Sequence, residues 1–552
     1  MKQLAALLIL TSLAFGLSQC YSQVRTVEVP VVGVSLGPGG EERGVVGTLQ
    51  VTVAYPGKGE IYVASEPLTE VDTQGVARVA VLVASALAHK DWTKYDFFFK
   101  FRTPSVIVGG PSAGLAMTVA AYSALTGTPL REDVAGTGTV GPDGVVGPVG
   151  GVYAKMVAAA KSGYKVFVVP KGEEVVTRKV VETEPLPFGI VQRLRTEKVN
   201  LIEEGKRLGV EVVPAATAYD ALRVWLKGAE LPECKPDVRL PGDVLRLMRE
   251  WKEHYLKLYE GARSEARRLT QESVALLSEA ERMARAAGEE KDPYEAVNYA
   301  FTAAILAEEA KWYDEVALSG FRALVKLSDE VESKINEANA TIMNSLTYDV
   351  NKLDPLLTAA TRVLKAYYFY HAALNSTDLG NIIYYLVLAK YYSEAAKTWI
   401  ALTSLEPPGP KADPEALWRD ALALYSSAGE LFAYYTTIGS QVGAVPSREL
   451  EVAVGVYKEA NDMPAIYKLA ASTYLSALVT YSLHTTYNIS SETMIDKVMA
   501  ALSCNAALAL DRGLKPYAAE IYYTSARASE GEAAFLYAAL ASTHFLLLSL
   551  LA

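Results

Sequence analysis

The chain changes character near residue 230, and this change constrains its fold more than any other feature of the sequence. Before that point Val and Gly dominate, and β-branched runs are separated by turn signals such as the Pro and Gly residues of 56–59. After it, Ala, Leu, Tyr, Glu and Lys recur at helical spacing. The sequence therefore predicts a first region of mixed helices and strands and a second region made of helices alone.

The positions of Pro and Gly residues predict where the elements and regions begin and end. In the first region, strands are expected near 47–54, 59–64, 95–101 and 165–170, with helices over 76–88, 112–125 and 151–162. Residues 229–243 are rich in Pro and Gly and predict a linker. Over 244–532, large Tyr residues recur among small Ala residues, which is what stacked helical hairpins need. No fixed period identifies a named repeat family.

The first 22 residues predict an export signal. A positive start at Lys2 is followed by an apolar stretch from Leu4 to Leu17 and then by small residues. An uncleaved membrane anchor is the minority interpretation. A lipoprotein cleavage site before Cys20 is a weaker one, because Gln19 stands where a small residue is expected.

The last twenty residues, 533–552, contain no acidic or basic side chain and one histidine, His544. A segment of this length can span a bilayer, so a C-terminal membrane anchor is one interpretation. A buried final helix of the helical region is the other, and the sequence does not decide between them.

Composition narrows the classes of function. The formal net charge is −10 and no long basic run occurs, so we expect no nucleic-acid partner. Outside the export signal only Cys234 and Cys504 remain, too few for a disulfide framework or a four-thiolate zinc site. An oxidising compartment would allow these two to pair. With no His-Glu-x-x-His pattern in the sequence, we expect neither a metal nor another cofactor.

The strongest chemical signal is the run Gly-Gly-Pro-Ser-Ala-Gly over 109–114, directly before an apolar helix. It puts Ser112 at the first turn of that helix, where free backbone N–H groups and the positive end of the helix dipole lie. Such a turn can stabilise the negatively charged oxygen of an acyl-transfer intermediate. The alternative is that Ser112 only caps the helix.

A second signal is Lys155, which lies early in an otherwise uncharged helical segment over 152–160. A lysine among apolar side chains is desolvated, and desolvation lowers its pKa. The neutral amine is then a usable general base for a serine hydroxyl. The alternative is that the side chain extends to water.

Together these segments resemble the proteolytic domain of the Lon family of Ser-Lys peptidases, in its archaeal secreted or membrane-associated branch. The motif Gly-Pro-Ser-Ala-Gly falls at 110–114, the threonine-glycine pair at Thr137 and Gly138, and the double glycine before Lys155 at 150–151. The interval from Ser112 to Lys155 is the one that the family pattern leads us to expect. The resemblance covers roughly 45–225, which is under half of the chain.

The resemblance implies an α+β proteolytic domain of Lon type over 24–228, followed by an all-α, solenoid-like domain of helical hairpins. It implies a serine endopeptidase acting on proteins or peptides, and commonly a homo-oligomeric ring. The implied roles are Ser112 as nucleophile, Lys155 as base, Thr137 as the residue that orients the lysine, and Gly110, Pro111 and Ala113 as the loop around the oxyanion.

The sequence departs from the family pattern in two places. Gly109 stands where family members often carry an acidic residue, which puts the local shape of the site in doubt. The stretch 171–205 is longer than its family counterpart, and it is expected to form either a flap over the site or a surface excursion.

The sequence also shows no motif of the ATPase module that the Lon family carries. No Gly-x-x-x-x-Gly-Lys-[Ser/Thr] phosphate loop occurs, and only about two dozen residues precede the expected proteolytic domain. We therefore expect an ATP-independent peptidase acting on unfolded or flexible proteins in the cell envelope. A Ser-His-Asp triad could draw only on His89 in this region. The hypothesis from a different class is a non-catalytic scaffold protein on a protease-like domain, because large helical stacks usually bind partners.

Overall fold

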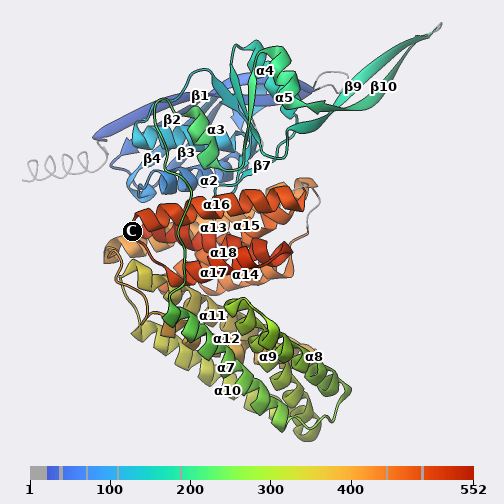
Figure 1. Cartoon of the computed structure of the whole chain (residues 1–552), viewed down its shortest axis with the longest axis vertical. Helices are drawn as coiled ribbons and strands as arrows, with labels where there is room; N and C mark the ends of the chain where they lie inside the picture. The colour runs from blue at the N-terminus through green and yellow to red at the C-terminus, as the bar shows by residue number, and fades with distance from the viewer. Residues whose placement is uncertain are drawn as a thin grey trace, which may run out of the picture.

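The computed structural model describes residues 21–36, 42–69, 72–108, 111–186, 189–442, 445–486 and 490–552. Gly109, Gly110 and all but the last two residues of the expected export signal lie outside the described residues. The molecule has three tiers (Figure 1). An α/β region forms one end, the helices of residues 414–551 form the middle, and those of 242–402 form the other end.

A four-stranded sheet in the order β1-β2-β4-β3 forms one layer of the α/β region. Strands β1 and β2 pair antiparallel, as do β2 and β4, whereas β3 runs parallel to β4. Strand β1 is therefore an edge strand of this sheet. The bounds are β1 (Gln23–Leu36), β2 (Glu42–Tyr55), β3 (Ile61–Thr69) and β4 (Asp96–Val108).

Two apolar helices and a second sheet complete the core of this region. Helices α2 (Asp72–Leu87) and α3 (Gly114–Thr126) pack together, and every residue of α3 from Gly114 to Leu125 is buried. The second sheet is parallel, in the order β11-β8-β5, and its strands are connected through helices, as parallel pairing requires. The remaining bounds are β5 (Val134–Gly136), β6 (Thr139–Val140), β7 (Val146–Gly147), α4 (Val152–Lys161), β8 (Val166–Pro170), α5 (Leu201–Leu208), β11 (Glu211–Ala215) and α6 (Ala218–Trp225).

The long stretch 171–205 contains a β-hairpin of β9 (Val175–Leu186) and β10 (Gly189–Asn200). These strands pair only with each other, in antiparallel register. The ribbon projects from the α/β region away from both helical tiers (Figure 1). Of the two forms expected for this stretch, the structure shows the surface excursion.

Twelve helices make up the described part of the chain after residue 241, and the predicted fold class is confirmed. Their bounds are α7 (Gly242–Glu265), α8 (Gln271–Glu289), α9 (Pro293–Ser319), α10 (Phe321–Asn344), α11 (Val350–Leu374), α12 (Leu379–Leu402), α13 (Pro414–Val442), α14 (Arg448–Glu459), α15 (Ala465–Thr486), α16 (Ser491–Asp511), α17 (Tyr517–Ala528) and α18 (Gly531–Leu551). Helices α13 and α18 contact α2, so the end of the chain packs against its beginning (Figure 1).

The connection between the two regions spans residues 227–241, which form neither helix nor strand. It runs past the middle tier to reach α7 in the far tier (Figure 1). A disulfide between Cys234 and Cys504 fastens it to α16. The two cysteines that the sequence left unassigned are therefore bonded to each other.

Two described helices, α16 and α18, are long and apolar enough to cross a membrane by length and composition. Of their most apolar windows, 56% and 78% respectively are buried inside the protein. Helix α18 packs against α15, α16 and α17, and His544 Nδ1 lies 2.6 Å from Asp354 Oδ1 of α11. In this structure the C-terminal segment is an interior helix of the helical region.

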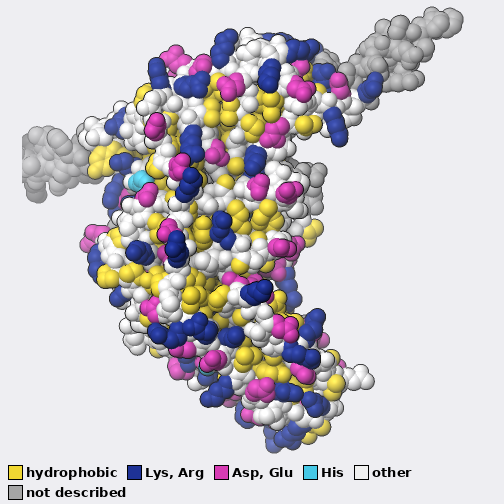
Figure 2. All heavy atoms as spheres, in the orientation of Figure 1, with side chains coloured by type: hydrophobic (Ala, Val, Ile, Leu, Met, Phe, Trp, Pro, Cys, Tyr) yellow, Lys and Arg dark blue, Asp and Glu magenta, His cyan; other side chains and the backbone are white. Residues whose placement is uncertain are grey.

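The surface shown in Figure 2 carries Lys and Arg side chains interspersed with Asp and Glu over all three tiers. This face has no continuous basic patch of the kind that follows a nucleic-acid backbone.

Candidate active site

Ser112 lies in a single 3-10 turn, Pro111–Ala113, that leads from β4 into α3. The N-cap residue of α3 is Ala113, and no side chain caps the helix. The interpretation of Ser112 as a cap is therefore wrong. Ser112 instead lines a pocket of about 360 Å³ whose wall also includes Lys155.

Lys155 lies on α4 and is only 4% exposed. Its Nζ donates a hydrogen bond to Thr137 Oγ1 at 3.3 Å, so the side chain does not extend to water. Burial lowers the pKa of Lys155 to about 8, while the charges of Glu173 and Glu42 oppose that shift. A substantial fraction of Lys155 is therefore neutral near pH 8 and able to accept a proton.

Thr137 is fully buried and connects the lysine to the serine turn. Its hydroxyl accepts the hydrogen bond from Lys155 and donates to the carbonyl oxygen of Ser112 at 3.2 Å. The N–H of Gly138 donates to the same carbonyl, also at 3.2 Å, and Leu115 N–H donates back to Gly138 O. The structure thus brings Ser112, Thr137 and Lys155 together, as the sequence predicts.

Two glycines allow α4 to lie where it does. A Cβ atom on Gly44 of β2 would lie 2.0 Å from the carbonyl oxygen of Ala154, so only glycine permits this approach of the helix to the sheet. Gly151 is the N-cap residue of α4 and has a φ of +67°, in the left-handed region that favours glycine. Both glycines therefore allow α4, which carries Lys155, to pack close to the sheet.

The loop assigned to the oxyanion is placed only in part. Gly110 lies outside the described residues. Pro111 has no N–H and can shape the turn but cannot donate to an oxyanion. The amides of Ser112 and Ala113 remain as candidate donors at the start of α3, where the helix dipole favours negative charge.

The sequence interpretation missed a carboxylate behind the pocket. Glu173 lies just beyond the turn that follows β8 and accepts a hydrogen bond from the N–H of Val149 at 3.2 Å. Burial raises the pKa of Glu173 to about 7. A polar residue at the carboxyl end of a buried parallel strand is a signal that could have identified it.

Lys497 of α16, in the helical region, lies near Glu173 and Lys171 of the α/β region. This lysine is fully buried, its Nζ donates to the carbonyl oxygen of Lys171 at 3.0 Å, and the charge of Glu173 acts on it. Burial lowers the pKa of Lys497 to about 8. No local pattern in the sequence could have connected residue 497 to residue 173.

A second contact joins the helical region to the turn between β6 and β7. Nε2 of His484 on α15 lies 2.9 Å from Oδ2 of Asp143, and both side chains are 1% exposed. Asn505 Nδ2 donates to the carbonyl oxygen of Asp143 at 3.0 Å. Because this turn follows Thr137 in the chain, helices α15 and α16 support the segment that holds the site together.

Of the five histidines, His89 was the one considered for a triad. It lies in the turn after α2 with a φ of +53° and is absent from the described wall of the Ser112 pocket. Burial, followed by the charge of Arg512, lowers the pKa of His89. The structure brings lysine, and no described histidine, to the pocket of Ser112.

Comparison with known proteins agrees with this geometry. Residues 19–204 match the family model of the Lon protease (S16) C-terminal proteolytic domain. The Lon protease of Escherichia coli K12 is 35% identical over 172 residues, which is 30% of this chain and 21% of that protein. The archaeal Lon protease of Pyrococcus abyssi is 37% identical over 142 residues, which is 24% of this chain and 14% of that protein.

The α/β region is thus similar to the C-terminal proteolytic domain of Lon proteases. The resemblance to Lon is confirmed for this region, and the family match ends before the helical region begins. The chain spans about a fifth of the length of the curated relatives that it matches.

Proposed function

We propose that the protein is a serine endopeptidase that cleaves unfolded or flexible polypeptides without ATP, outside the cytoplasm. One observation carries the proposal. The buried amine of Lys155 and the turn that bears Ser112 are hydrogen-bonded to the same hydroxyl, that of Thr137, beside a shared pocket.

In the proposed mechanism the neutral Lys155 amine removes the proton from the Ser112 hydroxyl. Ser112 Oγ bonds to the peptide carbonyl carbon, and the amides of the Ser112 turn stabilise the negative charge on oxygen. The C–N bond breaks as Lys155 returns the proton to the leaving amine, which leaves an acyl-enzyme. Lys155 then takes a proton from water, whose oxygen bonds to the acyl carbon. The ester bond to Ser112 Oγ breaks as Lys155 returns the proton to Oγ, which releases the acid and restores the serine.

The pocket wall favours an extended substrate. Residues Val31 to Val34 of edge strand β1 line it, together with Val45 and Gly47 of β2. A strand at the edge of a sheet can pair with an added chain through backbone hydrogen bonds. This pairing needs a segment free of its own secondary structure, which supports unfolded or flexible polypeptides as substrates.

Two features support the absence of ATP and the location outside the cytoplasm. The sequence contains no phosphate-loop motif. The expected export signal over 1–22 agrees with the Cys234–Cys504 disulfide, since such bonds persist in oxidising compartments. Since α18 is packed inside the helical region, we propose export without insertion of this helix in a membrane. The homo-oligomeric ring is an expectation from the resemblance.

The pH dependence of cleavage tests the mechanism. Lysine must be neutral to act as a base, so kcat/KM on unfolded casein without nucleotide should rise with pH and level off above an apparent pKa of about 8. A base with the ordinary lysine pKa of about 10.4 would still be gaining activity at pH 9.

The matched control is Glu173→Gln, which keeps an acceptor for Val149 but removes the charge that opposes the shift in Lys155. The rising limb of the profile should move to lower pH in this variant. A profile that is flat from pH 6 to pH 10 in the unmodified enzyme, or falls over that range, would contradict lysine as the base.

A further inference from the structure

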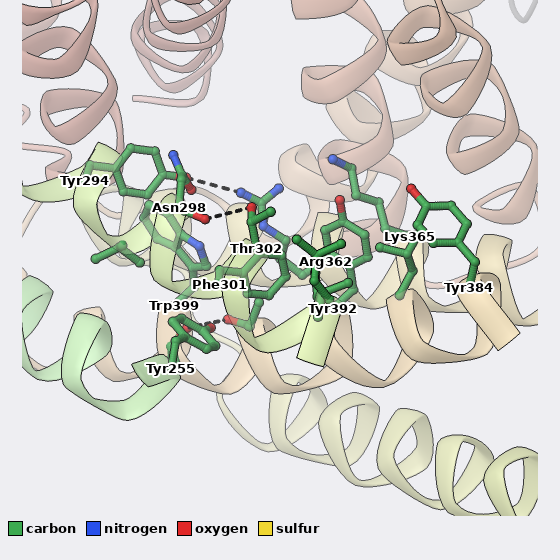
Figure 3. A pocket seen from close by; sticks show the side chains of 16 residues that line it. Tyr255, Tyr294, Asn298, Phe301, Thr302, Arg362, Lys365, Tyr384, Tyr392 and Trp399 are labelled. Carbon is green, nitrogen blue, oxygen red and sulfur yellow. Dashed lines mark hydrogen bonds between the residues drawn. The ribbon is translucent and has the colours of Figure 1, made fainter. Parts of the chain in front are cut away.

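A second pocket, of about 430 Å³, lies within the far helical tier, outside the α/β region (Figure 3). Helices α7, α9, α11 and α12 form its walls. Its volume falls in the range of small-molecule sites, roughly 300–1,000 Å³. Nothing in the proposed peptidase mechanism uses it.

Two cationic side chains line this pocket, Arg362 and Lys365, one turn apart on α11. They project from the same side of that helix (Figure 3). No acidic residue is part of the described pocket wall. Arg362 Nη2 has one long contact, 3.5 Å to the hydroxyl of Tyr294, and neither cation forms an ion pair with a described residue.

Lys365 is the more deeply buried of the two and is only 8% exposed. Its Nζ lies over the ring faces of Tyr392 and Tyr474, at 5.2 and 4.3 Å from their centroids, and donates no hydrogen bond within the described chain. Burial, followed by the charge of Arg362, holds the pKa of Lys365 well below its usual range, and Glu449 opposes this. Without a counter-charge the buried amine is pushed toward its neutral form, and a bound anion would favour its protonated form.

Several of the other polar groups of the pocket already have partners. Asn298 Nδ2 donates to the hydroxyl of Tyr537 at 2.8 Å, and the hydroxyls of Tyr255 and Thr398 lie 3.2 Å apart. The charged groups of the described pocket wall are both basic, Arg362 and Lys365. Arg362 is protonated at any relevant pH, and its planar fork suits a carboxylate or phosphate.

The rest of the wall is aromatic and aliphatic. Phe301, Tyr392 and Trp399 supply ring faces, and Ile305 and Leu388 supply aliphatic surface. We propose that this pocket binds a small amphipathic anion, whose carboxylate or phosphate lies between Arg362 and Lys365 and whose aromatic or aliphatic body packs against these rings. A free organic acid and the C-terminal residue of a polypeptide share this chemistry.

The test is isothermal titration calorimetry on the full chain carrying Ser112→Ala, so that peptide probes are not consumed. Phenylbutyrate is compared with its neutral amide, and an acetylated tripeptide ending in phenylalanine is compared with its C-terminal amide. A charge-assisted hydrogen bond predicts that each acid binds at least about tenfold more tightly than its amide. The tighter of the two acids identifies the source of the anion.

Arg362→Met is expected to weaken binding of the acid at least about tenfold and to abolish the preference over the amide. Lys365→Met supplies a second variant that removes a buried charge without emptying the space. Arg322→Met, an exposed change on α10, is the matched control and should bind as the parent does. Equal binding of acid and amide, or no acid binding below about 1 mM, overturns the proposal.

Discussion

In the Lys155→Met variant, cleavage of unfolded casein is expected to fall by about a thousandfold or more. The amine is the one described basic group in the wall of the Ser112 pocket, and its burial lowers its pKa to about 8. Without it the Ser112 hydroxyl has no base to take its proton. The rate is measured from the release of peptides at pH 9, where the parent enzyme is on its plateau.

The fold should survive this substitution. Methionine keeps most of the aliphatic volume, and Thr137 still donates its hydrogen bond to Ser112 O. The unfolding temperature should therefore stay near that of the parent. Lys161→Met is the matched control, because Lys161 is an exposed lysine on the same helix, and it should cleave casein at the parental rate. Parental activity in Lys155→Met would remove lysine from the mechanism.

His484→Ala is expected to lower the free energy of unfolding by about 3–5 kcal/mol. The substitution leaves the buried carboxylate of Asp143 with one described partner, the N–H of Val145 at 3.2 Å from Oδ1, and opens a cavity in α15. Because the Asp143 turn follows Thr137, the variant should also cleave casein more slowly. Thermal unfolding followed by circular dichroism gives the first effect, and the casein assay gives the second.

The control for this prediction is a second histidine–carboxylate pair on the surface. His371 Nδ1 lies 3.1 Å from Glu459, and its side chain is 49% exposed. Exposed pairs contribute little, so His371→Ala should cost under about 1 kcal/mol and leave activity unchanged. Equal losses of stability in the two variants would show that the Asp143–His484 contact does not hold the two regions together.

Several strands and helices of the α/β region, such as β2, β4, α2, α3 and α4, could be predicted because their signals are local, whereas β1, the β9–β10 hairpin and β11 were not predicted. The glycines and prolines that end each element, and the apolar run after Ser112, lie within a few residues of what they determine. The motif residues Ser112, Thr137 and Lys155 were predicted for the same reason, and the structure brings them together.

The contacts across the two regions could not be predicted from the sequence. Asp143 and His484 are separated by 341 residues, and Lys497 reaches Lys171 across 326. Helical periodicity shows which face of α15 or α16 is buried but not which surface covers it. The sequence therefore left open that the last helices, rather than the first, pack against the peptidase-like region.

The location of the final helix could not be predicted from the sequence for a different reason. A bilayer and a protein interior both favour twenty apolar residues, so composition alone leaves two interpretations of 533–552. The buried contact of His544 with Asp354 separates them, and this partner lies 190 residues away.

The most direct test of the central claim is cleavage of unfolded casein without nucleotide by the purified protein and by its Ser112→Ala variant, assayed side by side. The parent should release peptides with no ATP present, and the variant should release none while keeping the parental unfolding temperature. Equal cleavage by both proteins would contradict Ser112 as the nucleophile. No cleavage by either would contradict an autonomous peptidase and favour a scaffold on a protease-like domain.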